Sequence, residues 1–200
     1  MPSSRLPFLL APLCLGAYGV IRILDGLDGG RGPGLAWTAG HVFFLVGLVF
    51  FGQTLRTMRA LAGRTRLATA GLVTGIAGAL ALGGQFAIDV VVGFLAADRA
   101  GMDAHFARIQ DVPGVDVVFY SYGPLLFFAG QFVLVTLLAV RRRVKPWAPV
   151  LVLAEIVLPV LDKDFIPLGA ALLLVAFAPL IRPVAEPSTS DSAALGRLGA

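Results

Sequence analysis

Residues 35–56 read LAWTAGHVFFLVGLVFFGQTLR, and this stretch holds no Asp, Glu, Lys or Arg before Arg56. An apolar run of about 20 residues is long enough to cross the hydrocarbon core of a bilayer as an α-helix. Runs of the same kind recur before and after it in the chain. The sequence therefore predicts an all-α fold, a polytopic membrane helical bundle.

The composition agrees with a membrane protein and argues against several other classes. Of the 200 residues, 58% are hydrophobic and 14% are charged, whereas soluble domains are about 25% charged. The net charge of +4 comes from short connections between spans, so it does not predict nucleic-acid binding. Cys14 is the single cysteine, which leaves no disulfide framework and no cysteine metal site. No phosphate-, dinucleotide- or zinc-binding motif occurs, so no cofactor and no metal are expected.

Six spans can be drawn, and each is expected to be a helix because backbone polar groups in lipid must be satisfied within the segment. At about 1.5 Å per residue, the last two are shorter than a full span. Together the spans form a six-helix transmembrane domain, residues 1–183. The Pro-, Ser- and Ala-rich residues 184–200 are expected to be a disordered cytoplasmic tail. The spans lie at about residues 6–24, 35–56, 67–95, 115–140, 147–161 and 166–181.

Basic residues predict which side of the membrane each connection faces. Two connections carry four basic residues each and no acid. Cytoplasmic connections are enriched in Lys and Arg, so both connections, and with them both termini, are expected in the cytoplasm. The Arg-, Ala- and Gly-rich composition is typical of a bacterium, which predicts the bacterial cytoplasmic membrane as the location. The basic residues are Arg56, Arg59, Arg64 and Arg66 in one connection, and Arg141, Arg142, Arg143 and Lys145 in the other.

The longest connection, residues 96–114, allows two interpretations. Met102, Phe106 and Ile109 recur in it at helical spacing, which fits a short helix lying over the mouth of the bundle. An ordinary loop with a few apolar residues fits equally well. The third span carries a stripe of small residues that predicts close packing against another helix. The stripe consists of Gly71, Gly75 and Gly78.

Five spans each carry a polar side chain at a similar distance from their outer ends. At about 1.5 Å per residue, all five lie roughly 8–9 Å below the outer surface. An ionisable group in hydrocarbon costs at least about 2.5–3.5 kcal/mol and generally faces the bundle interior with a partner. For Asp89, the candidate partners are Gln85 one turn earlier, and His41, Glu155 or Arg22 on other helices. The five residues are Tyr18, His41, Asp89, Tyr120 and Glu155.

Each of these residues also has a purely structural interpretation. Asp89 could pair with Arg22 or His41 and have no further role, and the carboxyl of Glu155 could reach toward water. His41 could anchor the membrane interface, and the tyrosines could belong to the aromatic belt of membrane helices. The functional interpretation rests on the coincidence of all these residues at one depth.

A one-sided polar layer above an apolar floor fits a lipophilic, isoprenoid-like substrate with one reactive end. Two carboxyl groups in different environments can divide the roles of general acid and general base. Asp89 and Glu155 are therefore the catalytic candidates. Tyrosine side chains beside them could stabilise a cation through their π faces. The substrate-binding candidates are Tyr18, Arg22, His41, Gln85 and Tyr120.

With Asp89 and Glu155 in its helices, the chain resembles the small integral-membrane terpene cyclases of meroterpenoid and indole-terpenoid pathways. The resemblance covers the general layout of about residues 6–181. Those enzymes are helical bundles of similar size that rely on intramembrane acidic residues. The resemblance implies an isomerase- or lyase-type cyclisation of an isoprenoid that begins with protonation and needs no metal.

Two other functions remain open from the residues alone. A small transporter would use Asp89 and Glu155 to bind a proton or cation. A non-catalytic accessory membrane protein would use the polar layer only to fix the register of its helices. The expected partners are the lipid bilayer and a lipophilic small molecule, and the sequence leaves the substrate and the oligomeric state open.

Overall fold

The computed structural model describes residues 5–27 and 29–181, and within these residues the chain is helical with no strand. The tail expected at residues 184–200 lies outside the described residues, as does the end of the domain expected at 1–183. The helices are α1 (Leu6–Asp25), α2 (Leu35–Leu61), α3 (Arg66–Leu95), α4 (Arg99–Gln110), η1 (Asp116–Ser121), α5 (Tyr122–Val140), α6 (Ala148–Leu161), η2 (Lys163–Phe165) and α7 (Ile166–Ile181).

Helices occupy all six places at which the sequence predicts spans. Five of them are long and apolar enough to cross a membrane: α1, α2, α3, α5 with η1, and α7 with η2. The remaining one, α6, has 14 residues, which is about 21 Å at 1.5 Å per residue. It is shorter than the hydrocarbon core of about 30 Å. Of the two spans expected to be short, the last is thus lengthened by η2, and only α6 stays short.

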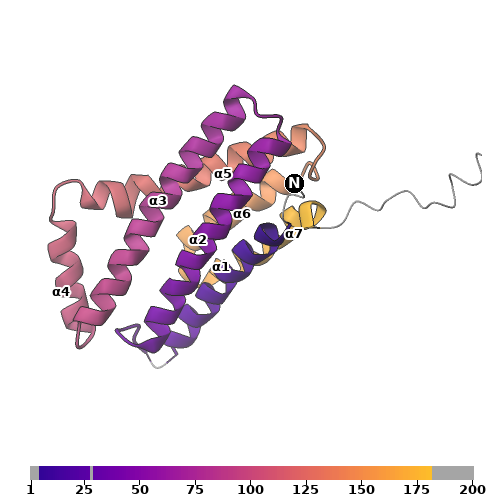
Figure 1. Cartoon of the computed structure of the whole chain (residues 1–200). Helices are drawn as coiled ribbons and strands as arrows, with labels where there is room; N and C mark the ends of the chain where they lie inside the picture. Colours follow the sequence, from indigo (N-terminus) through magenta and orange to yellow (C-terminus); the bar gives the residue numbers. More distant parts are fainter. Residues whose placement is uncertain (1–4, 28, 182–200) are drawn as a thin grey trace, which may run out of the picture.

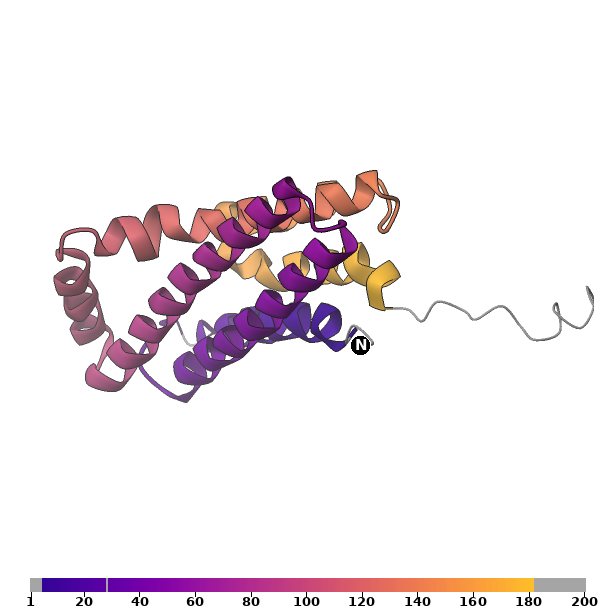
Figure 2. The ribbon, with the colours of Figure 1, turned by 45° about the horizontal axis from the view of Figure 1, so that its top comes forward.

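The six bundle helices form a closed ring in the order α1, α2, α3, α5, α6, α7, and α7 packs back against α1. The first helix of the ring is therefore a neighbour of the last (Figures 1 and 2). Helix α4 stands outside this ring. It lies across one end of the bundle, between the end of α3 and the start of η1 (Figure 2).

Helices α3 and α5 approach so closely that their backbones touch. A Cβ atom at Gly78 would collide with the backbone nitrogen of Phe127, and one at Gly130 would collide with the backbone of Gly75. A Cβ at Gly71 would also be crowded, because Val133 Cγ1 and Leu134 Cγ lie 3.1 and 3.3 Å from its position. The predicted small-residue stripe is confirmed as the contact face of α3, since only residues without side chains allow this spacing.

The two arginine-rich connections meet at one end of the bundle. The turn between α2 and α3 contains Gly63 at φ +79° and Arg64 at φ +54°. The Arg141 guanidinium, from the connection after α5, lies against Gly63: its Nη1 is 2.8 Å from the position of a Cβ. Thr65 then begins α3 as its N-cap, because its hydroxyl accepts a hydrogen bond of 3.2 Å from the Ala68 amide.

Large apolar side chains cover the outward faces of the ring. Soluble monomers rarely expose extended apolar patches, whereas lipid would cover these side chains in a membrane. Together with the length of the helices, this surface indicates a membrane protein. Examples that are at least 62% exposed are Val49, Val73, Leu80, Val150 and Val160.

The connection 96–114 contains the short helix α4, which decides between the two interpretations left open by the sequence. Asp98 is its N-cap, and its Oδ1 accepts a hydrogen bond of 2.8 Å from the Gly101 amide. Met102 is only 1% exposed, and Met102 and Phe106 both line a cavity beneath the helix. As expected for a helix over the bundle mouth, the apolar side of α4 faces inward.

The segment η1 is wound as a π-helix immediately before a proline of α5. Pro124 has no N–H and leaves the Tyr120 carbonyl without its α-helical donor. The Tyr122 amide bonds to the Val117 carbonyl, one residue further back than in an α-helix. Short π segments are frequent at functional sites, and this one places the Tyr120 hydroxyl against the carboxyl of Asp89 on α3.

Candidate functional site

A cavity of about 440 Å³ lies at the α4 end of the bundle, and we call it the α4-end cavity. Helices α1, α2 and α3 form its walls, α4 covers it, and the α1–α2 loop and η2 complete its rim. Five of the seven predicted site residues line this one cavity. They are Tyr18, Arg22, His41, Gln85 and Asp89.

The centre of the site is a buried pair from two helices. Asp89 of α3 is 7% exposed and His41 of α2 is 6% exposed, and Oδ2 of the carboxyl lies 3.5 Å from Nε2 of the imidazole. This is longer than an optimal hydrogen bond of about 2.7–3.2 Å.

The contacts of the two nitrogens of His41 indicate how protons can be arranged in this pair. Nδ1 of His41 lies 2.6 Å from the backbone oxygen of Trp37, and a carbonyl oxygen only accepts, so Nδ1 carries a proton. Nε2 faces a carboxyl oxygen, and that contact is favourable only with a second proton between the two atoms. The pair is thus either imidazolium with carboxylate or imidazole with carboxylic acid. Both forms can exchange a proton with a group in the cavity.

Trp37 contacts both members of the pair, although no role in the site was predicted for it. Besides accepting from His41, it donates from Nε1 to the backbone oxygen of Asp89 at 2.8 Å. Its ring lies 4.2 Å from the His41 ring, centre to centre. Gly93 makes room for the indole, because a Cβ there would lie 2.6 Å from Trp37 Cδ1. The available signal was its spacing, since Trp37 stands four residues before His41 on one helix face.

Tyr120 forms a hydrogen bond with the second oxygen of the Asp89 carboxyl. Its hydroxyl donates to Oδ1 of Asp89 at 3.2 Å, so the carboxyl of Asp89 contacts α2 through one oxygen and η1 through the other. Tyr120 does not line the α4-end cavity and acts on it through Asp89. Polar contacts thus join three members of the predicted layer, which are His41, Asp89 and Tyr120.

Aromatic rings form the floor of the cavity. Tyr18 meets His41, Phe44 and Phe86 edge to face, with ring centres 5.6, 5.2 and 5.2 Å apart. Phe44 and Phe86 are stacked at 3.7 Å. Phe86 lines the α4-end cavity, whereas Phe44 lines a second cavity deeper in the bundle. This stack therefore separates the two spaces.

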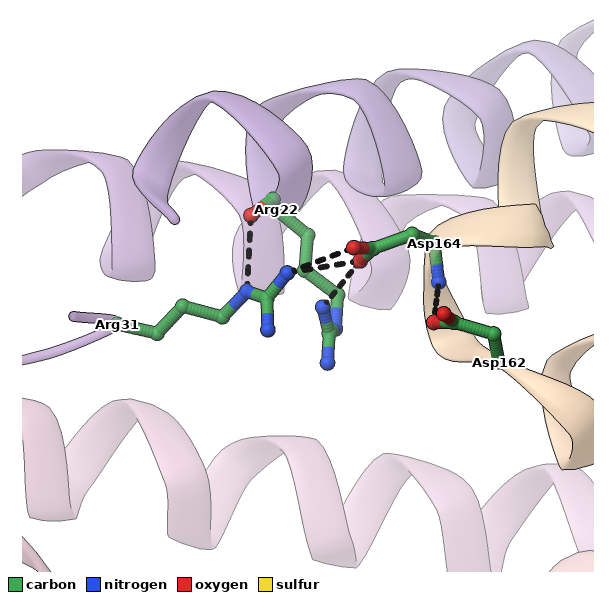
Figure 3. A network of polar contacts seen from close by, with 4 residues as sticks. All are labelled: Arg22, Arg31, Asp162 and Asp164. Atoms are coloured by element: carbon green, nitrogen blue, oxygen red, sulfur yellow. Dashed lines mark hydrogen bonds and ion pairs between the residues drawn. The ribbon is translucent and has the colours of Figure 1, made fainter. Parts of the chain in front are cut away.

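The rim of the cavity is held by a shared ion pair, drawn in Figure 3. Arg22 from α1 and Arg31 from the α1–α2 loop both donate to Oδ1 of Asp164 at 2.8 Å. The Asp164 amide in turn donates to Oδ1 of Asp162 at 2.8 Å. Arg99 of α4 joins the same rim by donating to the Arg31 backbone oxygen at 2.5 Å. Partly exposed ion pairs contribute little energy, so the main effect is to fix the rim geometry.

Glu155 lies apart from this layer, contrary to the expectation from the sequence. Its Oε2 accepts from Nε2 of Gln131 at 3.4 Å, and it lines the deeper cavity rather than the α4-end cavity. Along η1 and α5, Gln131 is roughly 15 Å beyond Tyr120 at about 1.5 Å per residue. The two predicted catalytic carboxyls, Asp89 and Glu155, are thus in different cavities.

The fold and the site define an all-helical protein with five helices able to cross a membrane and a buried Asp–His pair at one end. Within the described residues, no group of three or more His, Cys, Asp or Glu side chains is placed to hold a metal ion. Comparison with protein-family models, with curated proteins and with solved structures finds no match. The functional argument therefore rests on the geometry of the site.

Proposed function

We propose that the protein is an integral membrane enzyme that performs acid–base chemistry on a lipophilic substrate in the α4-end cavity. The observation that carries this proposal is the buried contact of 3.5 Å between His41 Nε2 and Asp89 Oδ2 at the wall of that cavity. A volume of about 440 Å³ falls within the range of about 300–1,000 Å³ for small-molecule sites.

The lining of the cavity suggests an amphipathic substrate. Its rim carries charged side chains of both signs, among them Arg31, Arg99, Asp103 and Lys163, and its floor is aromatic. A polar end would face the rim, and an apolar, isoprenoid-like body would lie on the ring of Phe86. This arrangement would hold the reactive part of the substrate beside Asp89.

The proposed reaction class is proton transfer to or from carbon or oxygen of the substrate. The proton-initiated cyclisation implied by the resemblance to membrane terpene cyclases is one such reaction, and the faces of Tyr18 and Phe86 could stabilise a cation in it. A division of acid and base roles between Asp89 and Glu155 is not part of the proposal, because the two line different cavities. In this proposal, Asp89 and His41 divide the roles of general acid and general base.

We also propose a six-span arrangement in a bacterial cytoplasmic membrane, with both termini in the cytoplasm and the α4-end cavity facing outward. The arginine-rich turns at Gly63 and Arg141 lie together at the end of the bundle opposite the cavity. Basic connections favour the cytoplasmic side. The short helix α6 would enter the membrane as a hairpin with α7, against which it packs.

The orientation predicts the labelling of single cysteines. In a Cys14→Ser background, Gln110→Cys at the end of α4 should react with a membrane-impermeant maleimide on intact cells. Pro146→Cys, in the connection after α5, should react only after lysis. Both positions are exposed, so accessibility through the membrane decides the result. The reverse pattern would show that the cavity opens toward the cytoplasm.

The enzyme proposal is tested with purified protein in nanodiscs and a panel of prenylated and epoxidised isoprenoids, followed by chromatography and mass spectrometry. Wild type should yield an isomeric product. Asp89→Asn should lower the rate by about 10²–10⁴, the usual contribution of general acid–base catalysis. Asp111→Asn, at an exposed position at the end of α4, is the matched control and should keep the rate. Equal rates for wild type and Asp89→Asn would refute the proposed role of this carboxyl.

A further inference from the structure

A second buried carboxyl lies in the bundle interior with a polar neighbour but no cation. Glu155 is 4% exposed and Gln131 is 0% exposed, and their single contact is the hydrogen bond from Gln131 Nε2 to Glu155 Oε2. Within the described part of the chain, no ion pair joins Glu155 to a basic side chain. A carboxylate in hydrocarbon generally has a partner that offsets the cost of its burial.

The pair lacks hydrogen-bond donors rather than acceptors. The side-chain oxygen of Gln131, Oε1, is buried and has no hydrogen-bond partner. Glu155 uses one carboxyl oxygen toward Gln131, and in its ionised form the carboxyl can only accept. A buried polar atom without a partner calls for a ligand, ion or water that supplies the missing bond. Of the two residues, Glu155 lines the adjoining cavity, so a group with N–H donors there would bond to its carboxyl.

The space beside Glu155 is apolar and aromatic, and we call it the central chamber. It has a volume of about 90 Å³ and is enclosed by five helices of the ring, α1, α2, α5, α6 and α7. Since one water occupies about 30 Å³ of liquid, the chamber has room for a group of only a few heavy atoms. Phenylalanine rings attract cations to their faces. The four rings that line it are Phe44, Phe51, Phe127 and Phe128.

We propose that the central chamber binds a primary alkylammonium group, with Glu155 as its counter-ion. The ammonium would donate hydrogen bonds to the Glu155 carboxylate, which lines the chamber, and its short alkyl chain would lie among the phenylalanines. A quaternary ammonium lacks the donors, and an alcohol lacks the charge. The site is independent of the proposed acid–base function, because the stack of Phe44 on Phe86 separates the central chamber from the α4-end cavity.

The test is isothermal titration calorimetry of wild-type protein in detergent with n-butylammonium, tetramethylammonium and n-butanol. A hydrogen bond to a buried charge is worth enough that n-butylammonium should bind at least about tenfold more tightly than either of the others. Glu155→Gln keeps the shape of the side chain and should lose this preference. Equal affinities of the three compounds for wild type would overturn the proposal.

A second variant locates the site. Asp89→Asn alters the other buried carboxyl and should bind n-butylammonium as wild type does. Loss of binding in Asp89→Asn with retention in Glu155→Gln would place the cation in the α4-end cavity and overturn the proposal, while leaving the acid–base function to its own test. If Glu155→Gln does not fold, the ranking of the three compounds on wild type and on Asp89→Asn decides.

Discussion

The Gly78→Ala variant is expected to lose at least about 3 kcal/mol of folding stability, the upper end of what overpacking normally costs. The added Cβ would collide with the backbone nitrogen of Phe127 on α5. A backbone atom cannot rotate away as a side chain can, so α3 and α5 would have to separate along their contact. Thermal unfolding in detergent, followed by circular dichroism or by size-exclusion chromatography of the heated sample, measures the loss.

Gly83→Ala is the matched control on the same helix. The nearest atom to its added Cβ would be Leu48 Cδ1 at 3.9 Å, an ordinary van der Waals contact. Alanine is a better helix former than glycine by about 1 kcal/mol, so this variant should be as stable as wild type or slightly more stable. Similar unfolding temperatures for the two variants would show that α3 and α5 do not pack as closely as described.

His41→Gln is expected to lower the rate of the proposed reaction by about 10²–10⁴. Glutamine can fill a similar volume and form hydrogen bonds, but its amide does not take up or release a proton near neutral pH. The variant therefore removes the proton exchange between His41 and Asp89 while leaving polar contacts possible. The rate is measured with the substrate that the isoprenoid panel identifies, alongside the unfolding temperature of the variant.

Glu155→Gln should keep a rate close to that of wild type in the same assay. Its side chain lines the central chamber, and the stacked rings of Phe44 and Phe86 stand between that chamber and the Asp89 site. A loss as large as that of His41→Gln would mean that both carboxyls act on one substrate. The two cavities would then have to open into one during the reaction, and the division of roles between Asp89 and Glu155 would be restored.

Much of the fold follows from the apolar runs in the sequence. Helices that cross a bilayer must be long and apolar, so an apolar run such as residues 35–56 predicts a helix without any knowledge of tertiary contacts. The glycine stripe on α3 was equally readable, because small residues serve helix packing in membranes. The ring order of the helices was not predictable, since helices that are apolar on every side carry little information about which side faces a neighbour.

The depth of each polar residue was counted from the outer end of its helix, and it predicted which residues meet where that end was predicted correctly. His41 and Asp89 meet as the rise per residue implied. Glu155 was misplaced because its depth was counted from the end of α6 at Leu161. The outer end of that hairpin lies further on, in η2, where Asp164 pairs with Arg22 at the rim.

The sequence did not predict which loop residues reach the rim or which polar residues pair with one another. Arg31 reaches the rim from an irregular segment, where no helical periodicity indicates its direction. Gln131 stood out as a polar residue in an apolar helix, but its meeting with Glu155 depends on the rotation of two helices about their axes. Only the packed structure fixes such rotations.

The closure of the ring by its first and last helices has a consequence for biogenesis. Phe8 packs on Phe177 with ring centres 5.5 Å apart, and Arg22 pairs with Asp164. Chains emerge from the ribosome N-terminus first, so α1 is without its neighbour α7 until nearly the whole protein has been made. During that time the nascent bundle has an open seam, and the central chamber is complete only once the final hairpin is in place. A chaperone or insertase that shields this seam would act on the side of α1 that later receives α7.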